Sequence, residues 1–471
     1  MSFRPHQKSE AKLKLERDGF HDSEGRRICF RGVNIAGNAK LPPFIPFNDP
    51  VWWDLLASWG FNMVRLTLFW EAIEPEPDDY DRAYLGKVTK LVEQASQRGI
   101  YILLDMHQDL FSRRLCGDGA PYWALPAEVN LKKNDGFGGQ FWGAAYTFSA
   151  DVRACFTHFF KSKSLQEHYK NAWQEVARSV GDNQHVLGYD IMNEPSQGNI
   201  ANDSGQFENR FLKPFYEDVV SAIREVQPSA IGFVEPSVQN MCTSKFTPFD
   251  LEGLVYAPHL YNPISITLRF DPLPEDMLFR ILLQSFKEKA KALGLPLFVG
   301  EFGAPWTMQP SYARNMAVGN ALENLEGSFI DCAYWDCSVK DVDSWNEEDF
   351  SIIDKRGRPR GLAVNSRPYI SRLQGSPVFQ RFEGKTRRYV ARFLSSPGVP
   401  PTVIRIPAVQ YPDGFCSCLS DGWAEYHGES EELWYYPAYD GYHRIGLKPV
   451  SKDSRINGKA QSMERLLRHK L

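Results

Sequence analysis

One short segment decides the fold, residues 186–195, which read VLGYDIMNEP. It starts as an apolar run of strand length and closes with Asn193, Glu194 and Pro195. Helix-period segments lie on both sides of it, roughly Leu165 to Val180 and Phe211 to Val226. Because a strand between two helices is the repeating unit of a parallel sheet, the segment indicates an α/β domain.

The same alternation of strand, loop and helix recurs along the first three quarters of the chain. One of the helical segments, Leu85 to Ala95, is followed by Gly99, a residue that favours a helix C-terminal cap. Eight such units predict a (β/α)8 TIM barrel with enlarged loops. The expected strands are Ile28 to Asn34, Met63 to Thr67, Tyr101 to Met106, Val186 to Ile191, Ile231 to Val234, Leu254 to Pro258, Leu297 to Gly300 and Cys332 to Trp335.

After Gln374 the pattern changes to short, partly alternating runs separated by Pro, Gly and Asp. Such runs are typical of antiparallel β structure. The sequence therefore predicts two domains, a catalytic (β/α)8 barrel over residues 1–374 and a C-terminal antiparallel β-sandwich over residues 375–471. The expected strands of the sandwich include Arg388 to Phe393, Thr402 to Ile406, Glu432 to Tyr436 and His443 to Leu447.

Composition excludes several classes of protein. Of 471 residues, 43% are hydrophobic and 24% are charged, the balance of a globular chain with a substantial core. The net charge of −4 gives no basic field for nucleic acid. No apolar signal or membrane-spanning run is visible, so we expect a cytoplasmic protein, or a secreted one if a signal was trimmed. The 8 cysteines have no CxxC spacing and predict reduced thiols rather than a zinc ribbon.

Two carboxylates stand where a barrel places its reactive groups. Glu194 follows the fourth expected strand and Glu301 the seventh, and the carboxyl ends of these strands face each other across a barrel mouth. A lone Glu after a strand is ordinarily a solvated loop residue. A facing pair is what glycoside hydrolysis requires, since one carboxyl protonates the leaving oxygen and the other attacks the anomeric carbon.

The motifs at the strand ends carry a family resemblance. Arg65, His107, the Asn193-Glu194-Pro195 triplet, His259 with Tyr261, Glu301 and Trp335 occur in the order found in the retaining β-glycosidases of glycoside hydrolase family 5, which this sequence resembles. The segments Asn34 to Lys40, His107 to Asp109 and Gly117 to Pro121 look like the endoglycoceramidase and glucosylceramidase branch. Members of that branch also carry a C-terminal β-sandwich.

The resemblance implies a role for each matched residue. Glu194 would be the acid/base and Glu301 the nucleophile. Asn193 would donate to the sugar 2-hydroxyl, Tyr261 and Arg65 would hold Glu301, and His259 would tune Glu194. The remaining matched residues would bind the sugar. Lys40, His107 and Asp109 would bind its hydroxyls, and Trp335 would contact its apolar face.

Two further features bear on the substrate. The loops Leu41 to Phe47 and Phe111 to Tyr146, the second with Trp123, Phe137, Phe141 and Trp142, are apolar for loops at a barrel mouth and indicate a surface for a hydrophobic aglycone. Packing of these side chains on one another or on the sandwich is the alternative. We interpret the acidic loop 338–349, with Asp341, Asp343, Glu347 and Glu348, as solvated surface, with crowding of the far sugar subsites as the alternative.

The leading hypothesis is a retaining β-glycosidase that cuts the bond between a sugar, glucose first, and a lipid such as ceramide or a sterol. It needs no metal or organic cofactor, because side chains and water do the chemistry. Its partners would be a glycolipid substrate and, transiently, a membrane or micelle surface, without nucleic acid. The alternatives are an endoglycoceramidase that releases an intact oligosaccharide, a β-glucan or mannan endo-hydrolase, and an inactive carbohydrate- or lipid-binding protein.

Overall fold

The computed structural model describes residues 12–130, 139–200, 203–262, 266, 269, 277–339, 348–450 and 468–469. Within these ranges eight parallel strands form one sheet in the order β10-β11-β4-β5-β6-β7-β8-β9. Tyr256 at the end of the last strand pairs in parallel with Leu297, which closes the sheet into a barrel. The strands are β4 (Arg31–Ile35), β5 (Met63–Leu68), β6 (Tyr101–Met106), β7 (Val186–Asp190), β8 (Gly232–Val234), β9 (Leu254–Tyr256), β10 (Phe298–Phe302) and β11 (Asp331–Tyr334).

The predicted barrel is confirmed, and its strands are buried along their whole length, as a parallel sheet covered by helices requires. Most strand boundaries lie within two residues of the expected ones, and one differs by more. The first expected strand was to begin at Ile28, but the run is divided, since Arg27 and Ile28 form β3 (Arg27–Ile28) and pair with Leu373 and Arg372 outside the barrel. The barrel strand β4 begins only at Arg31.

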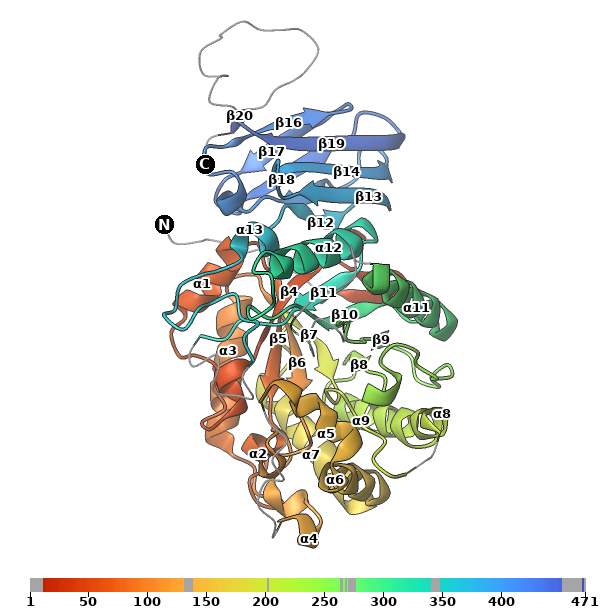
Figure 1. Ribbon diagram of the computed structural model, residues 1–471. Coiled ribbons are helices and arrows are strands. Elements are labelled where there is room, and N and C mark those ends of the chain that lie inside the picture. Colours follow the sequence, from red (N-terminus) through yellow and green to blue (C-terminus); the bar gives the residue numbers. More distant parts are fainter. Residues whose placement is uncertain are drawn as a thin grey trace, which may run out of the picture.

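Helices surround the barrel (Figure 1). The best defined start is that of α3, where the Asp81 carboxylate accepts hydrogen bonds from the backbone N–H groups of Ala83 and Tyr84. Gly99, with φ +68°, lies just after this helix, as the sequence predicted. The helices are α1 (Val51–Ser58), α2 (Trp70–Ile73), α3 (Arg82–Ser96), α4 (Ala127–Asn130), α5 (Ala145–Phe148), α6 (Ala150–Lys161), α7 (Lys163–Val180), α8 (Ser204–Phe207), α9 (Lys213–Val226), α11 (Met277–Leu293), α12 (Ala313–Gly327) and α13 (Leu362–Asn365).

The C-terminal part of the chain forms two antiparallel sheets that lie above the barrel in Figure 1, so the expected sandwich is confirmed. Burial alternates along its strands, with Tyr389, Ala391 and Phe393 pointing into the core between the sheets. The strands are β12 (Tyr369–Leu373), β13 (Ser376–Glu383), β14 (Arg388–Ser395), β15 (Thr402–Arg405), β16 (Phe415–Leu419), β17 (Trp423–His427), β18 (Glu432–Tyr436), β19 (Gly441–Pro449) and β20 (Arg468–His469).

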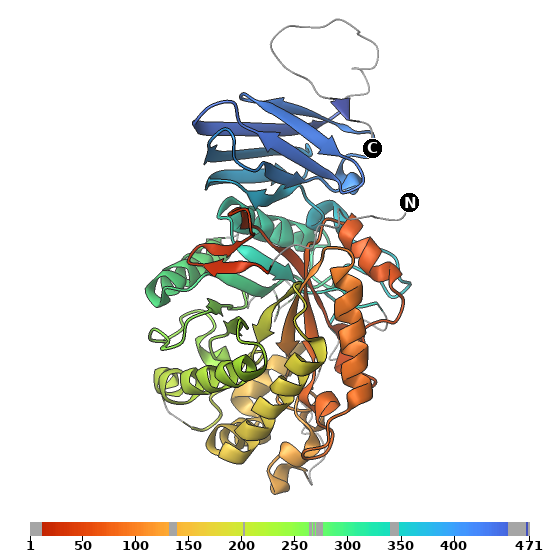
Figure 2. The same cartoon turned by 180° about the vertical axis from the view of Figure 1, so that it is seen from behind.

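Three N-terminal strands join this second unit, which the sequence did not predict. β1 (Lys14–Glu16), β2 (Gly19–His21) and β3 extend the sheet that contains β12, and Figure 2 shows them in red below the blue sandwich. Phe20 of β2 packs against Phe233 of the barrel strand β8, with ring centroids 6.1 Å apart. The domain boundary between residues 374 and 375 stays a prediction. Strands β3 and β12 precede Gln374 and yet belong to a sheet of the C-terminal unit, so strand pairing crosses this boundary.

Two general properties follow from the described residues. None of their helices is both long and apolar enough to cross a membrane. All 8 cysteines are free, and Cys29, Cys155, Cys332 and Cys337 are among the buried ones. Burial raises the pKa of the Cys29 thiol to about 11, so this thiol is unreactive near neutral pH.

Candidate active site

A cavity of about 410 Å³ lies at the carboxyl ends of the barrel strands. It lies within the usual range for small-molecule sites. Both predicted carboxylates line it, together with all of the predicted sugar-binding residues, while His259, predicted to tune Glu194, does not. The lining residues are Lys40, His107, Asp109, Phe141, Trp142, Gly143, Ala144, Asn193, Glu194, Tyr261, Ile266, Arg269, Glu301, Trp335, Glu348 and Phe350.

Glu194 follows β7 in a left-handed backbone conformation, with φ +42°. Such a conformation is uncommon for a residue with a side chain, and surrounding contacts must hold it. The Gln108 amide donates to the backbone oxygens of Asn193 and Glu194 at 2.7 and 3.0 Å, and the Glu194 N–H donates to the Glu235 carboxylate at 3.0 Å. Burial raises the pKa of Glu194, and the charge of Glu301 adds to this.

Glu301 at the end of β10 receives a hydrogen bond on each carboxylate oxygen. The Arg65 guanidinium donates to Oε1 at 2.8 Å and the Tyr261 hydroxyl to Oε2 at 2.9 Å, as the sequence analysis expected. One carboxylate oxygen of Glu194 lies within 4.8 Å of one of Glu301. The two carboxylates therefore meet across the cavity, and both oxygens of Glu301 are fixed in orientation.

Arg65 is fully buried beneath the cavity and organises its floor. Its guanidinium contacts four carboxylates, a number that only the planar, five-donor group of arginine can serve. It also donates to the side-chain oxygens of Asn34 and Asn193, at 3.1 and 2.9 Å. The four carboxylate partners are Asp105 at 3.0 Å, Asp190 at 2.8 Å, Glu235 at 3.0 Å and Glu301 at 2.8 Å.

His259 lies behind the cavity wall rather than on it, between three carboxylates. Its Nδ1 is 2.8 Å from Glu194 and 3.5 Å from Glu301, and its Nε2 is 3.2 Å from Glu235. Burial acts to lower the pKa of His259, but Glu235 and Glu301 outweigh it and raise this pKa well above its usual value. An imidazolium fits this position, with Nδ1 hydrogen-bonded to Glu194 and Nε2 in an ion pair with Glu235. His259 thus positions Glu194 and does not reach the cavity.

Glu235 is a functional residue that the sequence analysis missed. It follows the short strand β8 and is fully buried, and its carboxylate accepts from Arg65 and from the Glu194 N–H and forms an ion pair with His259. The sequence does contain a signal for this residue. The Glu235-Pro236 pair follows one strand just as the Glu194-Pro195 pair follows the preceding strand.

One end of the cavity is a cluster of charged side chains. The Lys40 ammonium lies 2.5 Å from the Asp109 carboxylate and 3.8 Å from that of Asp118. His107 lies between Asp105 at 2.7 Å and Asp109 at 3.3 Å, and although burial opposes its charge, Asp105 raises its pKa to about 10.

A close chain reversal holds this cluster together. Asp109 and Asp118 pair backbone to backbone, and a Cβ on Gly117 would lie 1.7 Å from the Asp109 oxygen. Gly117 is therefore required for the approach.

Trp335 follows β11 and forms part of the cavity wall. The Lys40 ammonium lies over its ring, 4.7 Å from the centroid, and the His107 ring is stacked on it at 5.4 Å. Glu348 approaches from the acidic loop and lies 4.0 Å from Lys40, with 17% of its side chain exposed. The interpretation of the acidic loop as solvated surface is therefore wrong for Glu348. Asp341, Asp343 and Glu347 lie outside the described residues.

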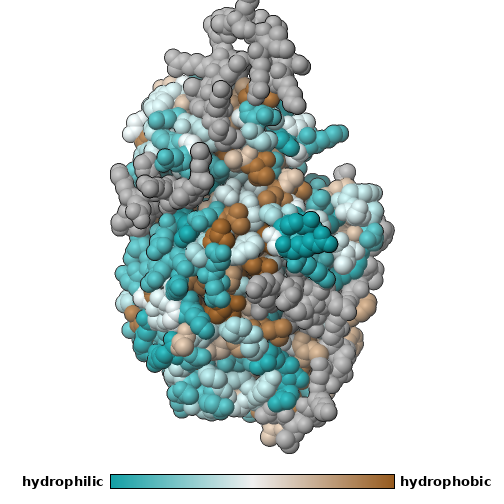
Figure 3. All heavy atoms as spheres, turned by 90° about the vertical axis from the view of Figure 1, so that its left-hand side faces the viewer, coloured by the Kyte–Doolittle hydropathy of each residue, from teal (hydrophilic) through white to brown (hydrophobic). Residues whose placement is uncertain are grey.

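The apolar loops fall into two groups. In the loop 41–47, Ile45 and Phe47 are buried, and Phe47 packs edge-on against Trp53 at 5.1 Å, so packing is the better interpretation there. Phe141 and Trp142 instead line the cavity, and Phe141 is 57% exposed. Phe137 lies outside the described residues. Figure 3 shows the side of the molecule at the left of Figure 1, where apolar side chains form a band between hydrophilic ones.

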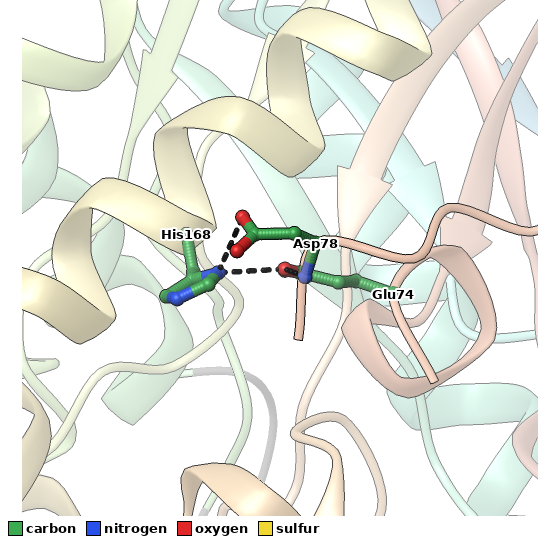
Figure 4. Close-up of side chains that lie close together, drawn as sticks. All are labelled: Glu74, Asp78 and His168. Carbon is green, nitrogen blue, oxygen red and sulfur yellow. Dashed lines mark hydrogen bonds and ion pairs between the residues drawn. The ribbon is translucent and has the colours of Figure 1, made fainter. Parts of the chain in front are cut away.

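Three groups of side chains in the described ranges have the composition of metal ligands. In the first group His259 is hydrogen-bonded to Glu194 and lies 3.5 Å from Glu301. In the group of His107, Asp109 and Asp118 the Lys40 ammonium already supplies the cation. The third group, Glu74, Asp78 and His168, is shown in Figure 4.

The third group is a structural one. Its buried Glu74 accepts from His168 at 2.7 Å, from the Asp78 N–H at 2.9 Å and from Trp70 at 2.8 Å. Glu74 is thereby fully hydrogen-bonded without an ion.

Comparison with known proteins agrees with this geometry. Residues 22–341 match the family Cellulase (glycosyl hydrolase family 5), and residues 367–443 match the glycoside hydrolase family 5 C-terminal domain. The protein is therefore a glycoside hydrolase. It belongs to glycoside hydrolase family 5.

Individual relatives in this family share only a low sequence identity with this chain. Endoglycoceramidase I of Rhodococcus hoagii is 26% identical over 437 residues, which cover 87% of this chain and 82% of the relative. A glucosylceramidase of Rhizopus delemar is 30% identical over 243 residues, 39% of this chain and 35% of that protein, so this chain matches about a third of its length. The fold is shared with sterylglucosidase 1 of Cryptococcus neoformans, with a TM-score of 0.79 at 17% identity over 93% of this chain and 97% of that one.

Proposed function

We propose that this protein is a retaining β-glycosidase that hydrolyses the bond between a sugar and a lipid. The observation that carries the proposal is the approach of Glu194 and Glu301 to within 4.8 Å in one cavity. Retaining glycosidases hold their two carboxyls about 5 to 5.5 Å apart, whereas inverting enzymes need about 6.5 to 9.5 Å to admit a water. The spacing favours the covalent route.

In the first step the Glu301 carboxylate attacks the anomeric carbon. The new bond forms as the bond from that carbon to the aglycone oxygen breaks, and Glu194 gives its proton to this oxygen. The aglycone leaves as an alcohol. Because burial raises the pKa of Glu194, its proton is retained until the leaving group requires it.

In the second step Glu194, now a carboxylate, takes a proton from water. The water oxygen attacks the anomeric carbon, the bond to Glu301 breaks, and the sugar leaves with its original configuration. Tyr261 and Arg65, which hold the two oxygens of Glu301, receive the charge that returns to that carboxylate. They act as positioning residues in both steps.

Asn193 is proposed to donate to the sugar 2-hydroxyl. Its side-chain oxygen accepts from Arg65 at 2.9 Å, which turns the amide nitrogen toward the Gln108 oxygen at 3.0 Å and the cavity it lines. Lys40, His107 and Asp109 offer donors and acceptors to the other hydroxyls, and Trp335 offers an apolar surface to the ring.

Two observations support a lipid aglycone. Phe141 and Trp142 give the cavity an apolar wall, with Phe141 more than half exposed. Two relatives in the family are named endoglycoceramidase and glucosylceramidase. We therefore propose glucosylceramide as the first candidate substrate and a steryl glucoside as the second. Such a substrate lies in a membrane or micelle, which the protein would contact transiently.

The test is to incubate the purified protein with glucosylceramide, a ganglioside and a steryl glucoside in detergent micelles, and to identify the released sugar by mass spectrometry. Release of sugar from at least one lipid is expected, and Glu301→Gln should abolish it. Cleavage of a soluble β-glucan or mannan with no release from any lipid would contradict the lipid assignment. A ligand-binding protein without activity would cleave none of these.

A further inference from the structure

The acid/base carboxyl is carried by a backbone conformation that other parts of the chain must hold. Glu194 has φ +42°, in the left-handed region that a residue with a side chain seldom adopts. From this position its carboxylate reaches the Nδ1 atom of His259 at 2.8 Å. A return of the backbone to an ordinary conformation would swing the carboxylate away from His259. The groups that fix the backbone at Glu194 therefore also fix the acid.

The side chain of Gln108 fixes this backbone. It is only 6% exposed, and the two N–H groups of its amide serve the backbone oxygens of Asn193 and Glu194, at 2.7 and 3.0 Å. Its amide oxygen accepts from the Phe111 N–H at 2.8 Å. The chain also approaches Gln108 closely at Gly119, where a Cβ would lie 2.5 Å from that of Gln108. Gln108 is thus held at both its stem and its amide.

The loop that carries Gln108 is held in turn by Tyr146. Leu110 and Phe111 both have positive φ values, 52° and 75°, so this loop also needs support from outside. The Tyr146 hydroxyl accepts from the Leu110 N–H at 3.2 Å and from the Gln108 amide at 3.3 Å. Burial raises the pKa of Tyr146 well above its usual value, and the charge of Asp109 adds to this, so the hydroxyl stays neutral. One phenol oxygen thus ties the loop to α5.

Tyr146 is anchored in the protein core. Its ring lies 5.9 Å from that of Phe156 on α6, and Phe156 packs edge-on against Phe111 at 5.1 Å. In addition, Trp142 of η4 (Gly139–Ala144), which lines the cavity, lies 6.4 Å from the Tyr146 ring. A continuous chain of contacts therefore runs from the core to the acid/base, through Tyr146 and the amide that it contacts.

We propose that Gln108 and Tyr146 are positioning residues for the acid/base, Tyr146 by fixing the loop of Gln108 and Gln108 by fixing the backbone of Glu194. This inference rests on the proposed function, and it adds two residues on which proton donation to the aglycone depends. Neither makes a hydrogen bond to the nucleophile Glu301 within the part of the chain that the structure describes. Their effect on the acid is therefore separable from any effect on the nucleophile.

The chemistry of the leaving group makes this role measurable. The need for a proton grows with the basicity of the leaving oxygen, because a weakly basic oxygen leaves as a stable anion without help. Dinitrophenolate is such a leaving group, whereas the oxygen of an alkyl or lipid alcohol must be protonated. A misplaced acid should therefore slow the cleavage of an alkyl glucoside and spare that of a dinitrophenyl glucoside. A misplaced nucleophile should slow both.

The test measures kcat/KM, which reports the first step, for octyl β-glucoside and for 2,4-dinitrophenyl β-glucoside. We expect Gln108→Met to lower the value for the octyl glucoside about 100-fold and that for the dinitrophenyl glucoside less than about 10-fold. Tyr146→Phe removes a single oxygen and should lower the octyl value about 10-fold, with the dinitrophenyl value nearly unchanged. Tyr261→Phe, which acts on Glu301, should lower both values alike.

Gln166→Met is the matched control. Gln166 is 8% exposed, and its amide also donates to two backbone oxygens, those of Phe159 and Phe160 at 3.2 and 2.9 Å, but it does not line the cavity. It should leave the ratio of the two values unchanged, and thermal unfolding of each variant measures the loss of stability. Equal losses or no loss on the two substrates in Gln108→Met would overturn the proposal, as would a selective loss of the same size in Gln166→Met. If Gln108→Met does not fold, Tyr146→Phe decides in the same way.

Failure of the proposed function is distinguishable from failure of this inference. If the wild-type protein cleaves neither glucoside, the proposed function is wrong, and crystal structures of the variants give a second measurement. Displacement of the Glu194 carboxylate from His259 in Gln108→Met, but not in Gln166→Met, would support the positioning role although the reaction was wrong. A Glu194 carboxylate that stays in place in Gln108→Met would overturn the inference.

Discussion

The substitution Glu235→Gln tests how the acid/base is held. The Glu235 carboxylate accepts two hydrogen bonds, from Arg65 at 3.0 Å and from the Glu194 N–H at 3.0 Å, and it forms an ion pair with His259 at 3.2 Å. A carboxamide keeps one acceptor oxygen and turns an NH2 group toward at least one of these donors. Breaking a buried ion pair in this way costs about 3–5 kcal/mol of folding stability. A misplacement of Glu194 by about 1 Å would lower kcat/KM about 100-fold.

The same substitution should move the pH profile. Glu235 is the largest contribution that raises the pKa of His259, so its loss lets His259 become neutral at lower pH. The charge on His259 lowers the pKa of Glu194, so a neutral His259 leaves that pKa higher. Since Glu194 must be protonated to act as an acid, the rate is lost as pH rises through its pKa. The alkaline limb of kcat/KM should therefore shift to higher pH in Glu235→Gln.

The assay is kcat/KM on 4-nitrophenyl β-glucoside across the pH range, with thermal unfolding measured in parallel. Glu74→Gln is the matched control, because Glu74 is also fully buried and also bonded to a histidine (Figure 4), but does not line the cavity. It should lower stability without moving the alkaline limb. Wild-type activity and an unmoved limb in Glu235→Gln would refute the reasoning.

Three other outcomes are expected. Tyr261→Phe removes a hydrogen bond to a charged carboxylate, about 1.5–3 kcal/mol, and should lower kcat about 10- to 150-fold while the protein still unfolds cooperatively. Trp142→Ser should lower kcat/KM about 10-fold for glucosylceramide but leave the soluble aryl glucoside nearly unaffected, and equal losses on both would contradict an aglycone contact. A chain that ends at Ser366 loses β12, the partner of β3, together with the rest of the sandwich, and exposes Cys29 and Phe329, which are buried in the sandwich core, so we expect no cooperative unfolding transition, as followed by circular dichroism.

The sequence predicted the parts of the fold that local patterns encode. The eight barrel strands were visible because each is a buried apolar run between helix-period segments. The pairing of β3 with β12 was not, since Arg27-Ile28 is too short to be distinguished from the following run in β4. Only the tertiary structure reveals that Ile28 and Val33 belong to different sheets.

The site was predictable to the extent that its residues follow strands. Glu194, Glu301, Tyr261 and Trp335 line one cavity as expected. His259 was expected to tune Glu194, and it lies 2.8 Å from that carboxylate, behind the cavity wall. Glu348 was assigned to solvent since acidic runs are usually solvated, and only the fold brings it to Lys40.

The central claim is that Glu301 forms a covalent bond to the sugar while Glu194 acts as the acid/base. The most direct measurement is to inactivate the protein with 2-deoxy-2-fluoro-β-glucosyl fluoride, which slows the second step, and to locate the adduct by peptide mass spectrometry. We expect one fluoroglucosyl group on the peptide that contains Glu301, and its slow release should depend on Glu194. A label on another residue, or inactivation without any adduct, would contradict the account.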